Sequence, residues 1–109
     1  MKNSLNWINF YNPTDDWYYI SENERKTYIN KYNEIIKYVK NNGGKLIGSY
    51  KSRSNSEWSR YEIWEFPSVE MIVEMNNQLE EIGHYQYFEE NHVIGRKYIK
   101  DIRANKTNH

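Results

Sequence analysis

The 109-residue sequence contains no cysteine, which excludes a disulfide framework, thiolate metal sites and cysteine catalysis. No apolar run approaches the length of a membrane span, and the first ten residues, MKNSLNWINF, contain no apolar signal-peptide segment. The formal net charge is zero, because 15 Lys and Arg balance 15 Asp and Glu, which argues against a protein held to nucleic acid by phosphate contacts. We therefore expect a cytoplasmic bacterial protein with neither a nucleic-acid nor a membrane partner.

Familiar catalytic and cofactor motifs are also missing. The sequence has no glycine-rich GxGxxG phosphate cradle, and no Ser-His-Asp arrangement is legible. His84 and His92 do not stand at a recognised ligand spacing with Glu89 or Glu90. The sequence thus predicts neither a metal nor a bound organic cofactor.

Aromatic residues are abundant: the chain has 11 Tyr, four Trp and three Phe. Tyr and Trp combine apolar area with a polar group, so they favour interfaces and pockets that are dry at one end and wet at the other. The alternative is that a chain poor in leucine builds its core from aromatic residues.

Residue patterns predict the order βαββαβ. The first helix begins at a capping box, Ser21-Glu22-Asn23-Glu24, and ends at Gly43-Gly44. The second helix begins after the N-cap Ser68 and ends at Gly83. The predicted strands cover Leu5–Asn12, Lys45–Lys51, Glu57–Phe66 and His92–Ile99, with a loop at Asn12–Asp16 and a helical turn at Tyr85–Phe88.

This order predicts a ferredoxin-like α+β fold, in which two helices cover one face of a four-stranded antiparallel sheet. It excludes a Rossmann unit for nicotinamide or flavin. We expect one domain over residues 1–100 and a polar tail over 101–109.

Two of the predicted strands are apolar on both faces, whereas a sheet with one face in water should alternate cleanly. We expect the helices to cover one face and a second subunit to cover the other, giving a homodimer about a two-fold axis. One face of the 57–66 strand carries Trp58, Arg60, Glu62, Trp64 and Phe66, and the other carries Tyr61, Ile63 and Glu65.

Several short motifs carry a resemblance to a known superfamily. They are Trp17 with Ile20-Ser21 and Glu24-Arg25, Ile63-Trp64-Glu65-Phe66 running into Ser68, Tyr87-Phe88-Glu89, and Ile94-Gly95. With these motifs the chain resembles the dimeric α/β-barrel superfamily, which includes antibiotic-biosynthesis-type monooxygenases, EthD-like and stress-responsive barrels, and haem-degrading monooxygenases. Within it, the chain is most similar to small uncharacterised bacterial proteins of darcynin type. The resemblance implies a dimeric barrel and carries little chemistry.

His84 is the first candidate for catalysis, because histidine titrates near neutral pH and acts as acid, base or ligand. It follows Gly83 at a helix end. The resemblance implies a histidine near this point that faces a pocket between helices and sheet. The alternative is a helix-end histidine that binds backbone carbonyls.

Arg60 and Glu62 are the other catalytic candidates. If their face of the strand lines a cavity, Arg60 would hold a carboxylate or phenolate, and Glu62 would orient the substrate or move a proton. The alternative is an ion pair across strands at the dimer interface. The residues expected to contact a substrate are Trp7, Tyr50, Tyr61, Trp58, Trp64 and Tyr87.

Three functions remain open at this stage, and enzyme status is among the open points. The first is a small-molecule-binding protein that acts without a cofactor on an aromatic or polyketide-like substrate, as a monooxygenase, cyclase or isomerase. The second, implied by the resemblance, is haem binding with His84 as axial ligand; haem-degrading relatives carry a tryptophan in the second helix, and Val69–Glu81 has none. The third is a non-enzymatic interaction module.

Overall fold

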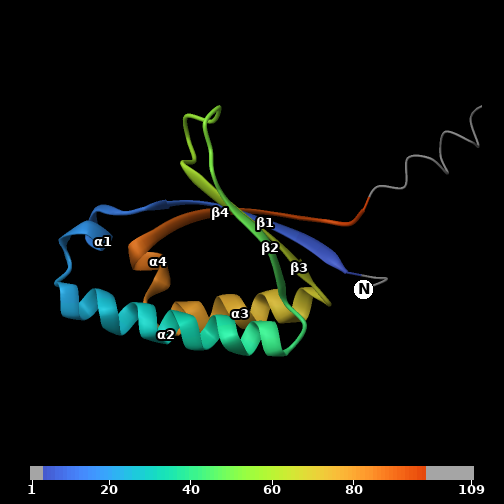
Figure 1. Cartoon of the computed structure of the whole chain (residues 1–109), viewed down its shortest axis with the longest axis horizontal. Coiled ribbons are helices and arrows are strands. Elements are labelled where there is room, and N and C mark those ends of the chain that lie inside the picture. Colours follow the sequence, from blue (N-terminus) through green and yellow to red (C-terminus); the bar gives the residue numbers. More distant parts are fainter. Residues whose placement is uncertain (1–3, 98–109) are drawn as a thin grey trace, which may run out of the picture.

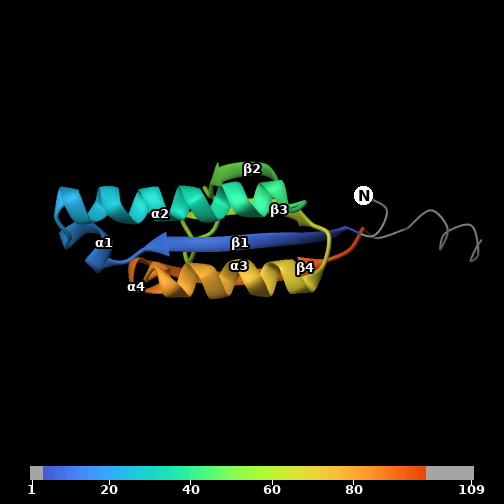
Figure 2. The same ribbon diagram turned by 90° about the horizontal axis from the view of Figure 1, so that it is seen from below.

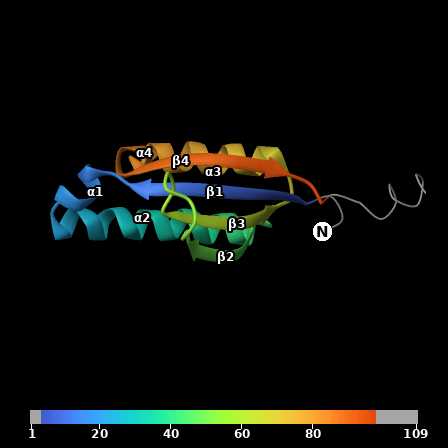
Figure 3. The same cartoon turned by 90° about the horizontal axis from the view of Figure 1, so that it is seen from above.

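The computed structural model describes residues 4–97, which form a four-stranded sheet covered on one face by helices (Figure 1). All strand pairs are antiparallel, and the strand order is β2-β3-β1-β4 (Figure 3). The two long helices, α2 and α3, lie side by side beneath the sheet (Figure 2). The elements are β1 (Leu5–Pro13), α1 (Asp15–Tyr19), α2 (Glu22–Asn41), β2 (Lys45–Lys51), β3 (Arg60–Phe66), α3 (Val69–Glu81), α4 (His84–Tyr87) and β4 (Phe88–Gly95). This is the ferredoxin-like α+β fold that the sequence predicts.

Both long helices begin at the predicted caps. The Ser21 hydroxyl accepts a hydrogen bond from the Glu24 amide at 3.1 Å, and the Ser68 hydroxyl accepts one from the Met71 amide at 3.2 Å. In the first cap the Ser21 hydroxyl also donates to the Glu24 carboxylate at 3.1 Å. Each bond satisfies an amide that the first helical turn leaves without a backbone partner.

The predicted start of the third strand is wrong by three residues. The segment before β3 pairs with a side chain instead of a strand: Asn12 donates to the Glu57 carbonyl at 2.8 Å and accepts from the Ser59 amide at 2.8 Å. Asn55 accepts from the amides of Glu57 and Trp58, which forms a side-chain turn. The ladder therefore begins only at Arg60.

Further boundaries differ from the predictions. The fourth strand begins at Phe88, four residues before the predicted start, because β1 extends to Pro13 and Phe88 is the residue that pairs with it. Asp15 and Asp16, the end of the predicted loop, instead form the first turn of the short helix α1, where negative charge stabilises a helix. The fourth strand ends at Gly95, so residues 96–97 are not part of the strand that the sequence predicts up to Ile99. The residues from 98 onward, with the polar tail predicted over 101–109, lie outside the described residues, so the domain limits stay a prediction.

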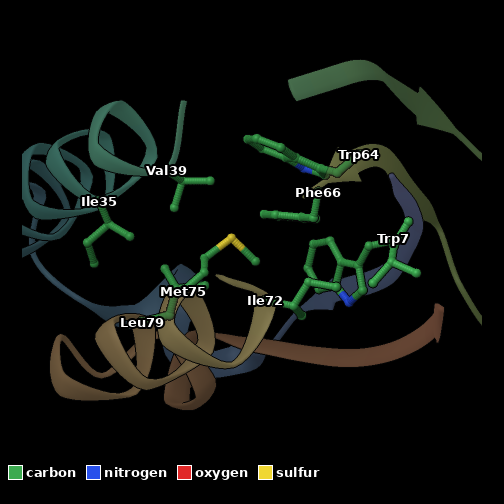
Figure 4. Close-up of a cluster of buried hydrophobic side chains, with 9 residues drawn as sticks. Trp7, Ile35, Val39, Trp64, Phe66, Ile72, Met75 and Leu79 are labelled. Carbon is green, nitrogen blue, oxygen red and sulfur yellow. The ribbon is translucent and has the colours of Figure 1, made fainter. Parts of the chain in front are cut away.

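The hydrophobic core lies between the sheet and the helices α2 and α3 (Figure 4). Trp7 meets Phe66 edge to face with ring centroids 5.9 Å apart, and Trp64 stacks on Phe66 at 5.6 Å. These rings come from paired positions of β1 and β3, since Leu5 lies opposite Phe66 and Trp7 opposite Trp64. The core consists of Leu5, Trp7, Ile35, Val39, Trp64, Phe66, Ile72, Met75 and Leu79.

The other face of the sheet also carries apolar side chains, as the sequence predicts. Tyr61 lies between Phe10 and Tyr50, with ring centroids 5.8 and 5.0 Å away. No helix among residues 4–97 covers this surface, which we call the open face and define as Ile8, Phe10, Tyr50, Tyr61, Ile63 and Val93. Within the described residues no helix is long and apolar enough to cross a lipid bilayer.

Candidate functional site

A cavity of about 260 Å³ lies between the sheet and the helices, at the end of the molecule that carries α1 and α4. Leu5 and Trp7 of the core stand at the start of β1, and Asn9 and Tyr11 of the cavity follow them along the same strand, so the cavity adjoins the core. Its walls are mostly aromatic, and its polar groups converge from three strands and two helices. The lining residues are Asn9, Tyr11, Trp17, Tyr28, Ile29, Tyr32, Glu62, His84, Phe88 and Glu90.

His84 stands at the centre of a hydrogen-bonded chain. The preceding Gly83 adopts a left-handed backbone with φ of 78°, which turns the chain so that His84 opens α4. His84 is buried; its Nδ1 lies 2.5 Å from the Tyr28 hydroxyl and its Nε2 lies 2.7 Å from a carboxylate oxygen of Glu90. Both ring nitrogens therefore bind side chains. We call this arrangement the Tyr28–His84–Glu90 chain.

Glu90 is the buried charge that holds this chain together. Its side chain is 5% exposed, and it lies near three donors: Nε2 of His84, Nε2 of His92 at 3.1 Å and the Asn9 side-chain amide at 3.1 Å. Burial alone would raise the pKa of this carboxyl, but the hydrogen bonds from His84 and His92, the positive charge that His84 carries when protonated, and the bond from Asn9 outweigh burial and lower the pKa to about 2. Glu90 is therefore ionised at neutral pH.

The partners of His84 indicate its tautomer. Because ionised Glu90 can only accept, Nε2 of His84 carries a proton and donates it. The Tyr28 hydroxyl then donates to Nδ1. We assign the neutral Nε2–H tautomer on this network. In this state the chain can take up one proton at Nδ1, next to a carboxylate that stabilises the imidazolium.

Three tyrosine hydroxyls around the cavity keep their protons at neutral pH. Burial raises the pKa of Tyr11, Tyr28 and Tyr32, and the charges of Glu62 and Glu90 raise each of them further. Arg60 opposes this effect at Tyr11. These tyrosines are thus hydrogen-bond donors, and both carboxylates act on all three of them.

Of the three predicted catalytic residues, the structure brings His84 and Glu62 to one cavity. Glu62 accepts hydrogen bonds from the indole of Trp64 at 3.1 Å and from the Ser49 hydroxyl at 3.4 Å. Arg60 shares the helix-facing side of β3, opposite Tyr11, but is not among the lining residues. No ion pair joins Arg60 to Glu62 in the described part of the chain.

The predicted substrate-contacting aromatics do not line this cavity. Trp7 and Trp64 belong to the core, and Tyr50 and Tyr61 lie on the open face. Trp58 lies in the loop before β3. Tyr87 packs edge to face against Trp17 and Tyr28 and lines a separate hollow beside α2.

Sequence reasoning missed most of the lining residues. Tyr28 and Tyr32 stand four residues apart on α2, a spacing that is typical of an apolar helix face and that here also places two hydroxyls on one side. Glu90 was considered only as a metal ligand. Its role depends on strand register, which sets Glu90 opposite Tyr11 and His92 opposite Asn9. Among residues 4–97, no group of three or more His, Cys, Asp or Glu is arranged to hold a metal ion.

Residues 5–107 match the model of a family of unknown function, DUF6616. No curated protein matches the sequence. Among solved structures, a mutant chlorite dismutase from Candidatus Nitrospira defluvii is similar over 94% of this chain and 44% of its own, with a TM-score of 0.72 and 11% identity. A haem-binding protein from Thermus thermophilus is similar over 84% of this chain and 38% of its own, with a TM-score of 0.67 and 10% identity.

This chain spans less than half the length of either structure. At such low identity, the likeness shows a shared fold and nothing about residues or reactions. The site must therefore be interpreted from its own geometry.

Proposed function

Because this chain belongs to the family of unknown function DUF6616, over a match that includes every residue of the cavity, we propose its function from the site itself. The protein binds a small aromatic molecule in the cavity and removes a proton from it. The observation that carries this proposal is the Tyr28–His84–Glu90 chain, a buried proton acceptor placed in an aromatic-walled cavity.

The aromatic walls supply the binding part of the proposal. Trp17 lies 5.1 Å from Phe88 and 5.4 Å from Tyr28, measured between ring centroids, and all three rings line the cavity. Planar walls of this kind favour planar ligands, since rings gain from stacking and edge contacts in addition to burial. A few polar groups among such walls then fix the ligand's orientation.

The proton transfer proceeds in two linked movements. The Tyr28 oxygen takes a proton from the ligand, while the proton of Tyr28 passes to Nδ1 of His84. The imidazolium that results is stabilised by ionised Glu90. The ligand anion can then react with dioxygen: one oxygen atom enters the ligand, and the ligand itself supplies the two electrons and two protons with which the other leaves as water. It can also close a ring or take a proton at another atom. These are monooxygenase, cyclase and isomerase reactions that need no organic cofactor.

Haem does not fit the site as it stands. An axial histidine must offer one ring nitrogen to iron, whereas both nitrogens of His84 are engaged by Tyr28 and Glu90. The cavity, at about 260 Å³, is also below the roughly 300–1,000 Å³ of pockets for drug-sized ligands. We derive no step through haem.

We also propose that the protein is a homodimer joined through the open face, because apolar rings and aliphatic side chains gather there. A closer relationship to darcynin-type proteins stays a prediction.

Native mass spectrometry of the purified chain, followed by assay on the ligand it carries, tests the proposed function. We expect an added mass from one small molecule per subunit. Tyr28→Phe should retain that ligand but lose its conversion, because the Tyr28 oxygen is the proton acceptor. The matched control is Tyr38→Phe: Tyr38 is on the same helix, exposed, with its hydroxyl bonded to Glu74 at 2.6 Å. Conversion that is equal in both variants would contradict the proton-transfer role.

A further inference from the structure

Three polar groups of the cavity are hydrogen-bond acceptors that face its interior from the sheet, in addition to the tyrosine hydroxyls and the already paired His84. Glu62 and Glu90 supply two carboxylates, and Asn9 supplies an amide oxygen. No Lys or Arg is among the lining residues, all of which belong to the described chain. Arg25 packs over the Trp17 ring at 5.1 Å and donates to its backbone carbonyl, and Arg60 acts on Tyr11, but neither lines the cavity.

Asn9 independently indicates that the ligand of this cavity supplies a hydrogen-bond donor. It is 4% exposed, and its amide nitrogen donates to Glu90, which fixes the orientation of the side chain because a carboxylate cannot donate. Its amide oxygen, Oδ1, is buried and accepts no hydrogen bond from the described residues. A buried acceptor without a donor costs free energy, so the site gains when a ligand supplies an N–H or O–H group.

Glu62 can receive the same kind of group. Its two carboxylate oxygens accept one indole bond from Trp64 and one long bond from Ser49, which leaves acceptor capacity free. Asn9 and Glu62 lie directly opposite each other on β1 and β3, on the side of the sheet that faces the helices. The two acceptors therefore stand next to each other at the sheet side of the cavity, facing aromatic walls from α1 and α2.

We infer that the ligand of this cavity is a small aromatic amine whose amino group, cationic or neutral, donates to Glu62 and Asn9 while its ring packs between Trp17 and the tyrosines. This inference rests on the proposed function, because it names the ligand class for the same cavity. It reverses the prediction that Arg60 holds a carboxylate or phenolate. An anionic group would instead meet two carboxylates without a lining cation.

The raised pKa values of Tyr11 and Tyr32 agree with this electrostatic picture. After burial, the charge of Glu62 is the largest cause of the increase at both hydroxyls. A field that disfavours a tyrosinate at these positions, while His84 is neutral, also disfavours a ligand that enters as an anion and favours one that carries an ammonium group. Aromatic faces add to this preference, since they attract cations.

Calorimetric titration with three probes that share a phenyl ring tests the inference: 2-phenylethylamine, 2-phenylethanol and 3-phenylpropanoate. The full chain is used at pH 7. We expect the amine to bind most tightly and the carboxylate to bind at least about tenfold more weakly, as expected for losing a hydrogen bond to a charged group. Glu62→Gln should weaken amine binding by about tenfold and change alcohol binding less. Glu34→Gln, on the exposed side of α2, is the matched control and should leave all three affinities unchanged.

The indole N–H resonance of Trp17 locates the binding, because Trp17 lines the cavity and Trp58 does not. If none of the three probes binds, and the purified chain carries no small molecule, the proposed function itself fails. If the alcohol or the carboxylate binds as tightly as the amine, small-molecule binding stands but the assignment of an amine is wrong. Amine binding that leaves the Trp17 resonance in place would also overturn the assignment.

Discussion

Glu90 is the residue on which the site depends most. A buried carboxylate is costly, and here the cost is offset by bonds from two histidines and one amide. Removing the charge leaves His84 without the partner that sets its tautomer. The same bonds that shape the cavity therefore make Glu90 a source of stability that depends on pH.

Glu90→Gln should change how stability depends on pH. Since the folded-state pKa of about 2 lies below the ordinary value of 4.5, the ionised group stabilises the fold fully above about pH 4.5. This contribution, on the order of 3 kcal/mol, is lost as pH falls from 4.5 towards 2. We expect the variant to be less stable at pH 7 and to lose less stability between these two pH values.

Urea unfolding at several pH values measures this effect, and Glu34→Gln, an exposed carboxylate of α2, is the control. Parallel pH curves for Glu90→Gln and the unsubstituted protein would show that Glu90 has no depressed pKa.

The residues of the site differ in how far the sequence could predict them. His84 and Glu62 could be proposed because a histidine after a glycine and a charged residue in an aromatic strand stand out locally. Glu90 and Asn9 could not be placed, because their contacts depend on the pairing of β1 with β4, and Glu90 and His84 meet only after α4 reverses the chain. Trp7 and Trp64 are predicted as ligand contacts and pack in the core instead of lining the larger cavity, since sequence alone does not say where between sheet and helices the core lies.

Helices and strands were easier to predict than contacts in the site, because the bonds that start a helix join residues close together in the sequence. Ser21 and Ser68 each bond to an amide three residues away, so each cap is contained within four residues of sequence. The start of β3 was wrong because it depends on Asn12, 45 and 47 residues away from its partners Glu57 and Ser59. Side-chain bonds over such distances leave no periodic pattern in the sequence.

Ser68→Ala tests the cap at the element scale. The substitution removes the acceptor for the Met71 amide at the start of α3, the helix that supplies Ile72, Met75 and Leu79 to the core. We expect the free energy of unfolding in urea to fall by about 1 kcal/mol. Ser54→Ala, in the exposed loop between β2 and β3, should change it by a few tenths at most. Equal stabilities for the two variants would mean that the cap contributes nothing.

At the scale of the whole molecule, the sheet has two apolar faces and one layer of helices. The face beneath holds both the core and the cavity, whereas the open face exposes Tyr50 and Val93. A contiguous apolar surface that is exposed to water is typical of a site at which another molecule binds. A second copy offers the same surface in return, which satisfies the two-fold symmetry of most small homo-oligomers.

Two matched valine substitutions test this homodimer. Val93 is 51% exposed on the open face, beside Ile8, and Val73 is 50% exposed on α3, on the helix side of the molecule. Sedimentation velocity at micromolar concentration should show a dimer for the unsubstituted protein and for Val73→Lys. Val93→Lys should shift the equilibrium towards monomer, because a lysine charge buried between two sheets would lose its hydration without a partner. A monomer before any substitution, or an equal shift in both variants, would show that the open face is not the interface, and its apolar side chains would then need another partner.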